Sequence, residues 1–443
     1  NNVIGFPYIF RGALDTAATA INEEMKIAAV HAIAALTKEP VPEVVNQAYQ
    51  VTNLKFGPDY FIPKPVDPRL IVRVSSAVAK AAMESGVARK RIDDWQAYAN
   101  HLRQIMGMES KLSQTLIETA RTAPQRVVFA EGTHPTILKA AAMARDLGIC
   151  HPILLGNDEY IRAKAEEVQV DLAGIEIVNL RSNSMAAKRE AYAALFAERN
   201  LRKGCTMQIA NDKMYERNYF GMMMVETGDA DAFITGLYTK GNNSIKVAKS
   251  VIGVRPPYKH FATMHIVNSK HGTYYLADTL INRKPDAETL CDIARLSADS
   301  VKFFAHDPVM AMVSYSNFGT DTEGSPAQMH QAVEMLHEQF PDLAVDGEMQ
   351  MRFALNNELR DERYPFTRLK GRKVNTLLFP NLSSANICAQ TLRDLGEDAE
   401  IIGPIQMGLN KPIHFTDTEC SVRDVINITA VAVIDAIVMK KKV

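Results

Sequence analysis

Short apolar runs alternate with amphipathic segments along most of the chain after residue 125. Runs rich in β-branched and aromatic residues are typical of buried strands, and apolar residues recurring every three or four positions are typical of helices. Strands are expected at 126–130, 153–155, 175–178, 232–235, 312–315, 376–379 and 401–402, and helices at 137–147 and 160–168. This repeated alternation predicts an α/β fold with a mostly parallel sheet that carries helices on its faces.

One segment departs from the alternation. Two apolar runs, 261–267 and 273–277, flank His271 and Gly272 without a helical stretch between them. Two strands joined by a short turn that contains glycine form a hairpin. We expect an antiparallel hairpin here, which can form an edge of the sheet.

The first 120 residues have a different, mainly helical pattern. Small and aliphatic side chains at helical spacing predict one long helix over 16–37 and a second over 70–86, with proline-rich extended chain between them. Residues 1–7 begin abruptly in the pattern of an apolar strand or loop, which indicates a cut within a longer protein. A polar helical stretch over 93–120 is expected to bridge to the α/β part.

Composition narrows the classes of function. A chain of 443 residues is expected to hold two or three packing units, and 50 Lys and Arg against 51 Asp and Glu give no charge excess that favours nucleic acid or an anionic membrane. The longest apolar run, 425–439, contains Asn427 and Asp435 and is too short to span a bilayer, so it predicts a buried terminal helix. Five scattered cysteines indicate a reducing cytoplasm, with each thiol acting as a small buried hydrophobe.

General motifs leave the chemistry open. No G-x-G-x-x-G follows a strand, and Gly236 and Gly241 have the spacing of a P-loop but precede Asn242 instead of lysine. His330 and His337, seven residues apart, fit surface positions better than metal ligands. Expected loops after strands combine glycine with small polar residues at 236–239, 314–319 and 403–408. Such loops suit a phosphate-bearing ligand, and ordinary turn chemistry accounts for them equally well.

The first 90 residues resemble the end of bacterial NADP-dependent malic enzymes, through segments 1–15, 20–26 and 61–70. That family converts malate and NADP to pyruvate, carbon dioxide and NADPH with Mg²⁺ or Mn²⁺. The resemblance implies that nearly all residues for this reaction, including those that hold NADP and the metal, lie upstream of Asn1. It also implies that Asn1 or Asn2 approaches malate and the nicotinamide in the intact protein.

The rest of the chain, from about residue 126 to 437, resembles phosphate acetyltransferases, through segments 129–132, 314–319, 346–350, 379–382 and 403–412. The two modules in this order are similar to hybrid malic enzymes. The resemblance implies a malic enzyme segment over 1–92, a helical linker over 93–125 and a two-lobed α/β domain with a ligand cleft over 126–437. One lobe is expected over 126–255 plus 405–437, and the other over 256–404.

Phosphate acetyltransferases use an Asp that takes up the CoA thiol proton, arginines that hold phosphate, and a Ser-Arg pair that stabilises the acetyl group in transfer. By resemblance, Asp424 keeps the Asp and Arg217 keeps one arginine, whereas Lys246 replaces another. Asp417 and Thr418 replace the Ser-Arg pair, which removes bidentate hydrogen bonds and adds a negative charge near an anionic substrate. Further residues expected to contact acetyl-CoA or its phosphates are Tyr238, Ser314, Ser316, Asn317, Gly319, Met407 and Lys411.

These replacements suggest that ligand binding is kept and acetyl transfer is lost. We therefore expect the α/β domain to bind acetyl-CoA as an effector that regulates a malic enzyme. An active phosphate acetyltransferase and a purely structural oligomerisation module are the two alternatives. The resemblance also implies a cytoplasmic homo-oligomer that forms a dimer through this domain and a larger assembly, without nucleic acid or membrane partners.

Overall fold

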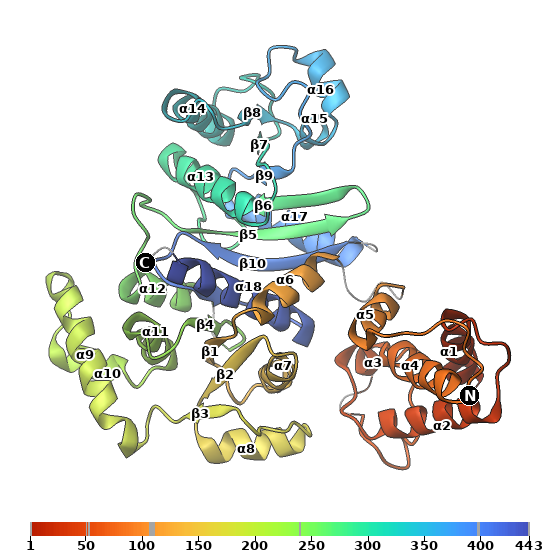
Figure 1. The fold of residues 1–443 in the computed structure, drawn as a ribbon. Coiled ribbons are helices and arrows are strands. Elements are labelled where there is room, and N and C mark those ends of the chain that lie inside the picture. The colour runs from red at the N-terminus through yellow and green to blue at the C-terminus, as the bar shows by residue number, and fades with distance from the viewer. Residues whose placement is uncertain are drawn as a thin grey trace. The chain divides into compact units, whose positions relative to one another are not determined.

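The computed structural model describes residues 2–49, 51, 54–105, 111–238, 241–396 and 399–441 (Figure 1). The chain divides into two compact units. The first comprises Asn1–Thr115 and the short segment Ala165–Asp171, and the second comprises Leu116–Lys164 and Leu172–Val443.

The first unit is helical, with a core formed mainly by α1, α2 and α4 and completed by α5. Its helices are α1 (Asn2–Asp15), α2 (Glu23–Thr37), α3 (Glu43–Ala48), α4 (Arg69–Glu84) and α5 (Trp95–Ile105). Leu70, Val74 and Val78 are fully buried at helical spacing along α4, which confirms the helix predicted over 70–86.

Two predictions for this unit were wrong in part. The apolar start of the chain is helix α1 and not a strand or loop, because Ile4 and Tyr8 are buried four residues apart, on one helical face. The helix expected over 16–37 begins only at Glu23, because the side chain of Asn22 accepts a hydrogen bond from the Met25 N–H and caps the helix there.

The predicted linker over 93–125 contributes its first helix to this unit. Tyr98 and Leu102 of α5 are buried in the core, and the Tyr98 hydroxyl donates to the Asp15 carboxylate over 2.7 Å. Helix α6 (Lys111–Arg121) follows and leads into the second unit.

The second unit contains a first sheet in which all strands are parallel. Its order is β11-β4-β1-β2-β3. The strands are β1 (Gln125–Phe129), β2 (Cys150–Leu155), β3 (Glu176–Val178), β4 (Ala232–Thr235) and β11 (Ile413–Phe415). The helices associated with this part are α7 (Pro135–Asp146), α8 (Asp158–Glu167), α9 (Ala186–Asn200), α10 (Met207–Lys213), α11 (Arg217–Thr227), α12 (Gly241–Val251) and α18 (Val422–Lys441). The predicted α/β fold with a parallel sheet is confirmed.

A second, mixed sheet has the order β10-β5-β6-β9-β7-β8. Its strands are β5 (Ala262–Ser269), β6 (Gly272–Ala277), β7 (Met310–Val313), β8 (Val345–Met349), β9 (Thr376–Leu378) and β10 (Glu400–Met407). The helices of this part are α13 (Ala287–Phe303), α14 (Gly324–Gln339), α15 (Met351–Leu355), α16 (Asn357–Arg363) and α17 (Leu382–Leu395). The predicted hairpin is confirmed as β5 and β6, but it lies inside the sheet, because β10 pairs with β5 and β9 pairs with β6.

Helix α18 packs against β1 and β4 of the first sheet and against β10 of the second (Figure 1). Its residues from Val425 to Ile434 are all buried, which confirms the predicted buried terminal helix. None of the helices in the described part of the chain has both the length and the apolar character that crossing a bilayer requires. The five cysteines are free thiols, and three of them, Cys150, Cys291 and Cys420, are buried as predicted, whereas Cys205 and Cys388 are partly exposed.

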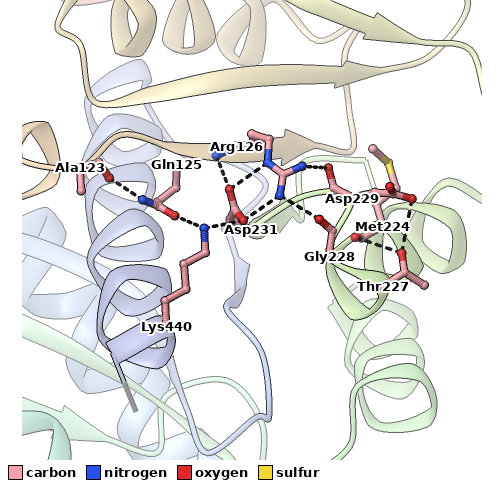
Figure 2. A network of polar contacts seen from close by, with 9 residues as sticks. All are labelled: Ala123, Gln125, Arg126, Met224, Thr227, Gly228, Asp229, Asp231 and Lys440. Carbon is pink, nitrogen blue, oxygen red and sulfur yellow. Dashed lines mark hydrogen bonds and ion pairs between the residues drawn. The ribbon is translucent and has the colours of Figure 1, made fainter. Parts of the chain in front are cut away.

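The far end of α18 is held by a polar network at the amino ends of β1 and β4 (Figure 2). Lys440 donates to the Gln125 side chain over 2.6 Å and lies 2.8 Å from the Asp231 carboxylate. The same carboxylate accepts from the backbone and the guanidinium of Arg126. Burial alone would raise the pKa of Asp231, but the hydrogen bonds from Arg126 and Lys440 outweigh it and lower the pKa to about 2.

Asp231→Asn is expected to lower the free energy of unfolding by about 1–3 kcal/mol at neutral pH, because charge-assisted hydrogen bonds to Arg126 and Lys440 are lost. A lowered folded-state pKa stabilises the protein above the unfolded value of about 3.9, and this contribution is lost as the pH falls towards about 2. Urea unfolding from pH 7 downwards should therefore show the two proteins converging. Asp158→Asn, which removes an exposed pair with Arg162, is the control and should stay within about 0.5 kcal/mol of the parent.

Candidate functional site

The carboxyl ends of β1, β4 and β11 meet at one edge of the first sheet, because the three strands are parallel neighbours. Glu131 follows β1 and is fully buried there. Its Oε1 accepts from the Thr235 hydroxyl over 2.9 Å and from the Gly236 N–H over 3.2 Å, at the end of β4. Burial raises the pKa of Glu131. A buried carboxyl group therefore links the ends of β1 and β4 at this edge of the sheet.

A cation and two aromatic rings form a cluster that includes residues from the loops after β1 and β4. Arg217 begins α11, and its guanidinium lies 5.4 Å from the centre of the Tyr238 ring, within the range of a cation–π contact. His134 lies 5.0 Å from the same ring, measured between ring centres, and burial lowers the pKa of His134. Tyr238 is 51% exposed and Arg217 is partly exposed, so solvent reaches both side chains. Two predicted residues, Arg217 and Tyr238, are thus brought together.

The segment after β11 carries the replaced Ser-Arg pair. Asp417 is partly exposed, and its carboxylate lies 3.1 Å from the guanidinium of Arg393. Thr418 is exposed. Asp424 accepts from the N–H and the hydroxyl of Ser421, and its own N–H donates to the Ser421 hydroxyl, which makes a capping box at the start of α18. Both carboxylates therefore have partners within the protein.

Cys420 connects this segment to the edge of the first sheet. Burial, together with the negative charges of Asp424, Asp417 and Glu131, raises the pKa of the Cys420 thiol to about 12. A Cβ atom on Gly236 would lie 2.2 Å from the Thr416 carbonyl oxygen, so the loops after β4 and β11 are in direct contact. The segment 417–424 thus belongs to the same site as Glu131.

A second edge forms where β7 and β8 end. The Ser316 hydroxyl and the Gly319 N–H donate to Glu348 Oε1 over 2.9 and 2.8 Å, and Glu348 is fully buried. The Ser314 N–H donates to the carbonyl of Met349, and the Asn317 side chain accepts from the Gln350 N–H. The predicted residues Ser314, Ser316, Asn317 and Gly319 therefore form one loop that is fixed by β8.

His330 and His337 both face β8 from α14. His330 is exposed, as predicted, and its Nδ1 lies 3.4 Å from Glu348 Oε2. His337 is partly buried, with Nε2 2.9 Å from the Val345 carbonyl oxygen. Among the described residues no group of three His, Cys, Asp or Glu side chains has the arrangement that a metal ion needs.

Three further predicted residues of the second unit, Met407, Lys411 and Lys246, take no part in the contacts described above. The run 403–408 was expected to be a loop, but β10 continues through it to Met407, which is buried and pairs with Ala262. Lys411 precedes β11, at the end opposite to Asp417, and Lys246 is exposed on α12. Asn1 lies outside the described residues, and Asn2 is the first residue of α1, so their predicted contact with malate stays a prediction.

Sequence reasoning missed Glu131, His134, Glu348 and Arg393 as parts of these sites. Glu131 lies within the segment 129–132 that carried the family resemblance, so that motif gave a signal for it. Glu348 lies likewise within 346–350. Nothing in the local pattern around His134 or Arg393 marks either residue, because their partners Tyr238 and Asp417 are distant in the chain.

Residues 111–433 match the model of the family described as phosphate acetyl/butaryl transferase. The chain belongs to this family. A phosphate acetyltransferase from Thermoanaerobacterium thermosaccharolyticum is 32% identical over 331 residues, which are 73% of this chain and 98% of the relative. A solved phosphotransacetylase structure from Streptococcus pyogenes superposes with a TM-score of 0.67 at 29% identity, covering 74% of this chain and 99% of the other.

Similarity also extends beyond the family match. An NADP-dependent malic enzyme from Escherichia coli (strain K12) is 39% identical over 440 residues, which cover 98% of this chain. The chain spans 57% of the length of that relative. The helical first unit, which lies almost wholly outside the family match, is therefore also shared with malic enzymes.

Proposed function

We propose that this chain is the regulatory, acetyl-CoA-binding and oligomerising part of a hybrid NADP-dependent malic enzyme, and that acetyl transfer has been lost. The observation that carries the proposal is the pair Asp417 and Thr418 at the positions where the resemblance calls for Ser and Arg. In the fold, Asp417 is paired with Arg393, and Asp424 is part of the helix cap with Ser421.

Loss of transfer follows from the chemistry of the missing groups. Removal of one donor that stabilises a transition state typically costs about 10²–10³ in rate. Thr418 offers a single hydroxyl and no charge in place of a bidentate guanidinium. The ion pair with Arg393 offsets part of the negative charge of Asp417, so the missing donors count for more than repulsion does.

Retention of binding is supported by the groups that remain at the two edges. Arg217 and Tyr238 offer a guanidinium and an exposed aromatic face, which suit a phosphate group and an adenine ring. The loop from Ser314 to Gly319 carries the partly exposed side chain of Ser314 at the end of a parallel strand, where phosphorylated ligands bind in α/β sheets. The predicted contact residue Ser316 is buried instead, and its hydroxyl donates to Glu348.

The intact protein is proposed to oxidise and decarboxylate malate, with acetyl-CoA acting as an effector. The support is the 39% identity to an NADP-dependent malic enzyme over nearly the whole chain. NADP and Mg²⁺ or Mn²⁺ would be held by residues outside this sequence, with Asn1 or Asn2 near malate and the nicotinamide. A cytoplasmic homo-oligomer, dimeric through the α/β domain, completes the proposal.

Calorimetric titration with acetyl-CoA tests the binding. The parent chain should give a saturable heat, and Arg217→Ala should weaken the affinity about tenfold or more, because a charge-assisted contact is lost. Arg181→Ala is the control, since Arg181 is exposed after β3 and should leave the affinity within about twofold. Absence of both heat and thermal shift would sink the effector proposal and favour a structural oligomerisation module.

An assay of acetyl transfer between acetyl phosphate and CoA tests the lost activity in the same sample. We expect no turnover above background. Sustained turnover would overturn the interpretation of Asp417 and Thr418 and identify an active phosphate acetyltransferase.

A further inference from the structure

The ion pair between Arg393 and Asp417 joins the parts of the second unit that carry the two sheets. Arg393 lies in the last turn of α17, which follows β9 and packs against β6 of the second sheet. Asp417 follows β11, an edge strand of the first sheet. The two side chains are 31% and 36% exposed, so solvent and solutes reach this pair.

A second neighbour of Arg393 is His265, which is uncharged. His265 of β5 is buried and its Nδ1 lies 2.8 Å from the Thr279 hydroxyl oxygen. Burial, and then the positive charge of Arg393, lowers the pKa of His265 to about 3, so His265 is neutral at neutral pH. In the part of the chain that the structure describes, Asp417 is the acidic side chain paired with Arg393. A guanidinium has five N–H donors, and the hydrogen bond to Asp417 uses one nitrogen, Nη1.

We propose that Arg393 supplies, from α17, a phosphate-binding guanidinium that the segment 417–418 no longer provides, and that Asp417 holds this guanidinium until a phosphate group of the ligand replaces the carboxylate. The ligand class is a phosphate-bearing acyl thioester, so the inference rests on the proposed function. Arg393 is a binding residue in this scheme, and Asp417 acts through Arg393 as a competitor of the ligand.

The position of the pair supports this role. Asp417 directly precedes Thr418, at the site where the family resemblance calls for arginine. Asp417 follows Thr416, whose carbonyl oxygen would lie 2.2 Å from a Cβ atom on Gly236, and the Gly236 N–H donates to Glu131. The pair is therefore close to the loop that holds Glu131 and leads to Tyr238. A phosphate group accepts two parallel N–H bonds from one guanidinium, one at each of two oxygens, whereas Asp417 makes a single contact.

A double-mutant cycle read by calorimetry with acetyl-CoA tests the proposal on the full chain. Arg393→Gln should weaken the affinity about tenfold, and Asp417→Asn should strengthen it about tenfold, because the competing carboxylate is gone. In Arg393→Gln/Asp417→Asn the gain from Asp417→Asn should vanish. An equal gain in both backgrounds would mean that Asp417 merely repels the ligand, and the proposal would be overturned.

Two further measurements separate a binding role from a structural one. Arg423→Gln breaks the neighbouring pair between Arg423 and Glu400, which joins α18 to β10, and should leave the affinity within about twofold. Arg393→Lys should have part of the affinity that Arg393→Gln loses, since lysine keeps the positive charge but cannot form the bidentate hydrogen bonds of a guanidinium. If Arg423→Gln weakens binding as much as Arg393→Gln, general loosening between the sheets explains both and the proposal fails. A parent chain that gives no heat contradicts the proposed function itself, whereas a parent that binds with an additive cycle contradicts this inference alone.

Discussion

Gly236→Ala should lower the free energy of unfolding by more than about 3 kcal/mol, because two costs combine at this position. The residue has a φ of +152°, which side chains rarely adopt, and an added Cβ would lie 2.2 Å from the Thr416 carbonyl oxygen. The Thr416 carbonyl group is part of the backbone and cannot move away from the added Cβ atom as a flexible side chain could. The loops after β4 and β11 must therefore separate, and a lower urea midpoint should come with weaker acetyl-CoA binding.

Gly228→Ala is the matched control for this change. Gly228 also has a positive φ, +83°, at the end of α11, but no heavy atom lies within 4 Å of the position that its Cβ would take. It should cost only about 1 kcal/mol, from backbone strain alone. Equal losses in the two variants would contradict the close approach of Gly236 to Thr416.

Glu131→Ala should cost about 2–4 kcal/mol of unfolding free energy, since it leaves a cavity and removes the acceptor for the Thr235 hydroxyl and the Gly236 N–H. Glu131→Gln keeps an oxygen acceptor and the volume, so its cost at low pH should be much smaller. The contrast between the two variants measures the acceptor role, and similar losses at low pH would contradict that role.

A comparison of Glu131→Gln with the parent protein at several pH values gives a further test, and the direction of the expected change follows from the pKa of Glu131. Because burial raises the folded-state pKa of Glu131, the folded protein binds this proton more tightly than the unfolded chain. That contribution to stability is full below the unfolded pKa of about 4.3 and declines as the pH rises through the folded value. Urea unfolding at several pH values should therefore show Glu131→Gln gaining on the parent as pH increases, and a constant difference would be the contrary result.

Much of the α/β fold follows from local pattern. Apolar runs marked β1, β2 and β4 because each strand contains at least three consecutive buried apolar residues, at 127–129, 152–155 and 232–234. Strand β8 was missed since it reads Val-Asp-Gly-Glu-Met. Its polar groups are buried only because distant residues satisfy them: Asp346 accepts from the Thr367 hydroxyl and the Arg368 N–H. No local pattern encodes such partners.

The candidate site likewise contains residues that the sequence predicted and partners that it did not. Arg217 and Tyr238 were predicted through a family resemblance, and the fold places them in contact. Asp417 was predicted to add a negative charge near an anionic substrate, but its partner Arg393, 24 residues earlier in the chain, was not predicted. Ion pairs of this kind depend on how the sheets pack, so the sequence predicted the residue and could not predict its electrostatic state.

The strand order of the first sheet has a consequence for synthesis of the chain. Strands β1 to β4 are complete by residue 235, but the edge strand β11 and the packed helix α18 come from residues 413–441, after the whole second sheet. Domains generally fold as units, from the N-terminus first, as the chain leaves the ribosome. The helical unit and the second sheet are free to form on the growing chain. The first sheet, in contrast, keeps the edge at β4 unpaired and lacks the packing of α18 until residues 413–441 have left the ribosome, and it needs protection from aggregation during that interval.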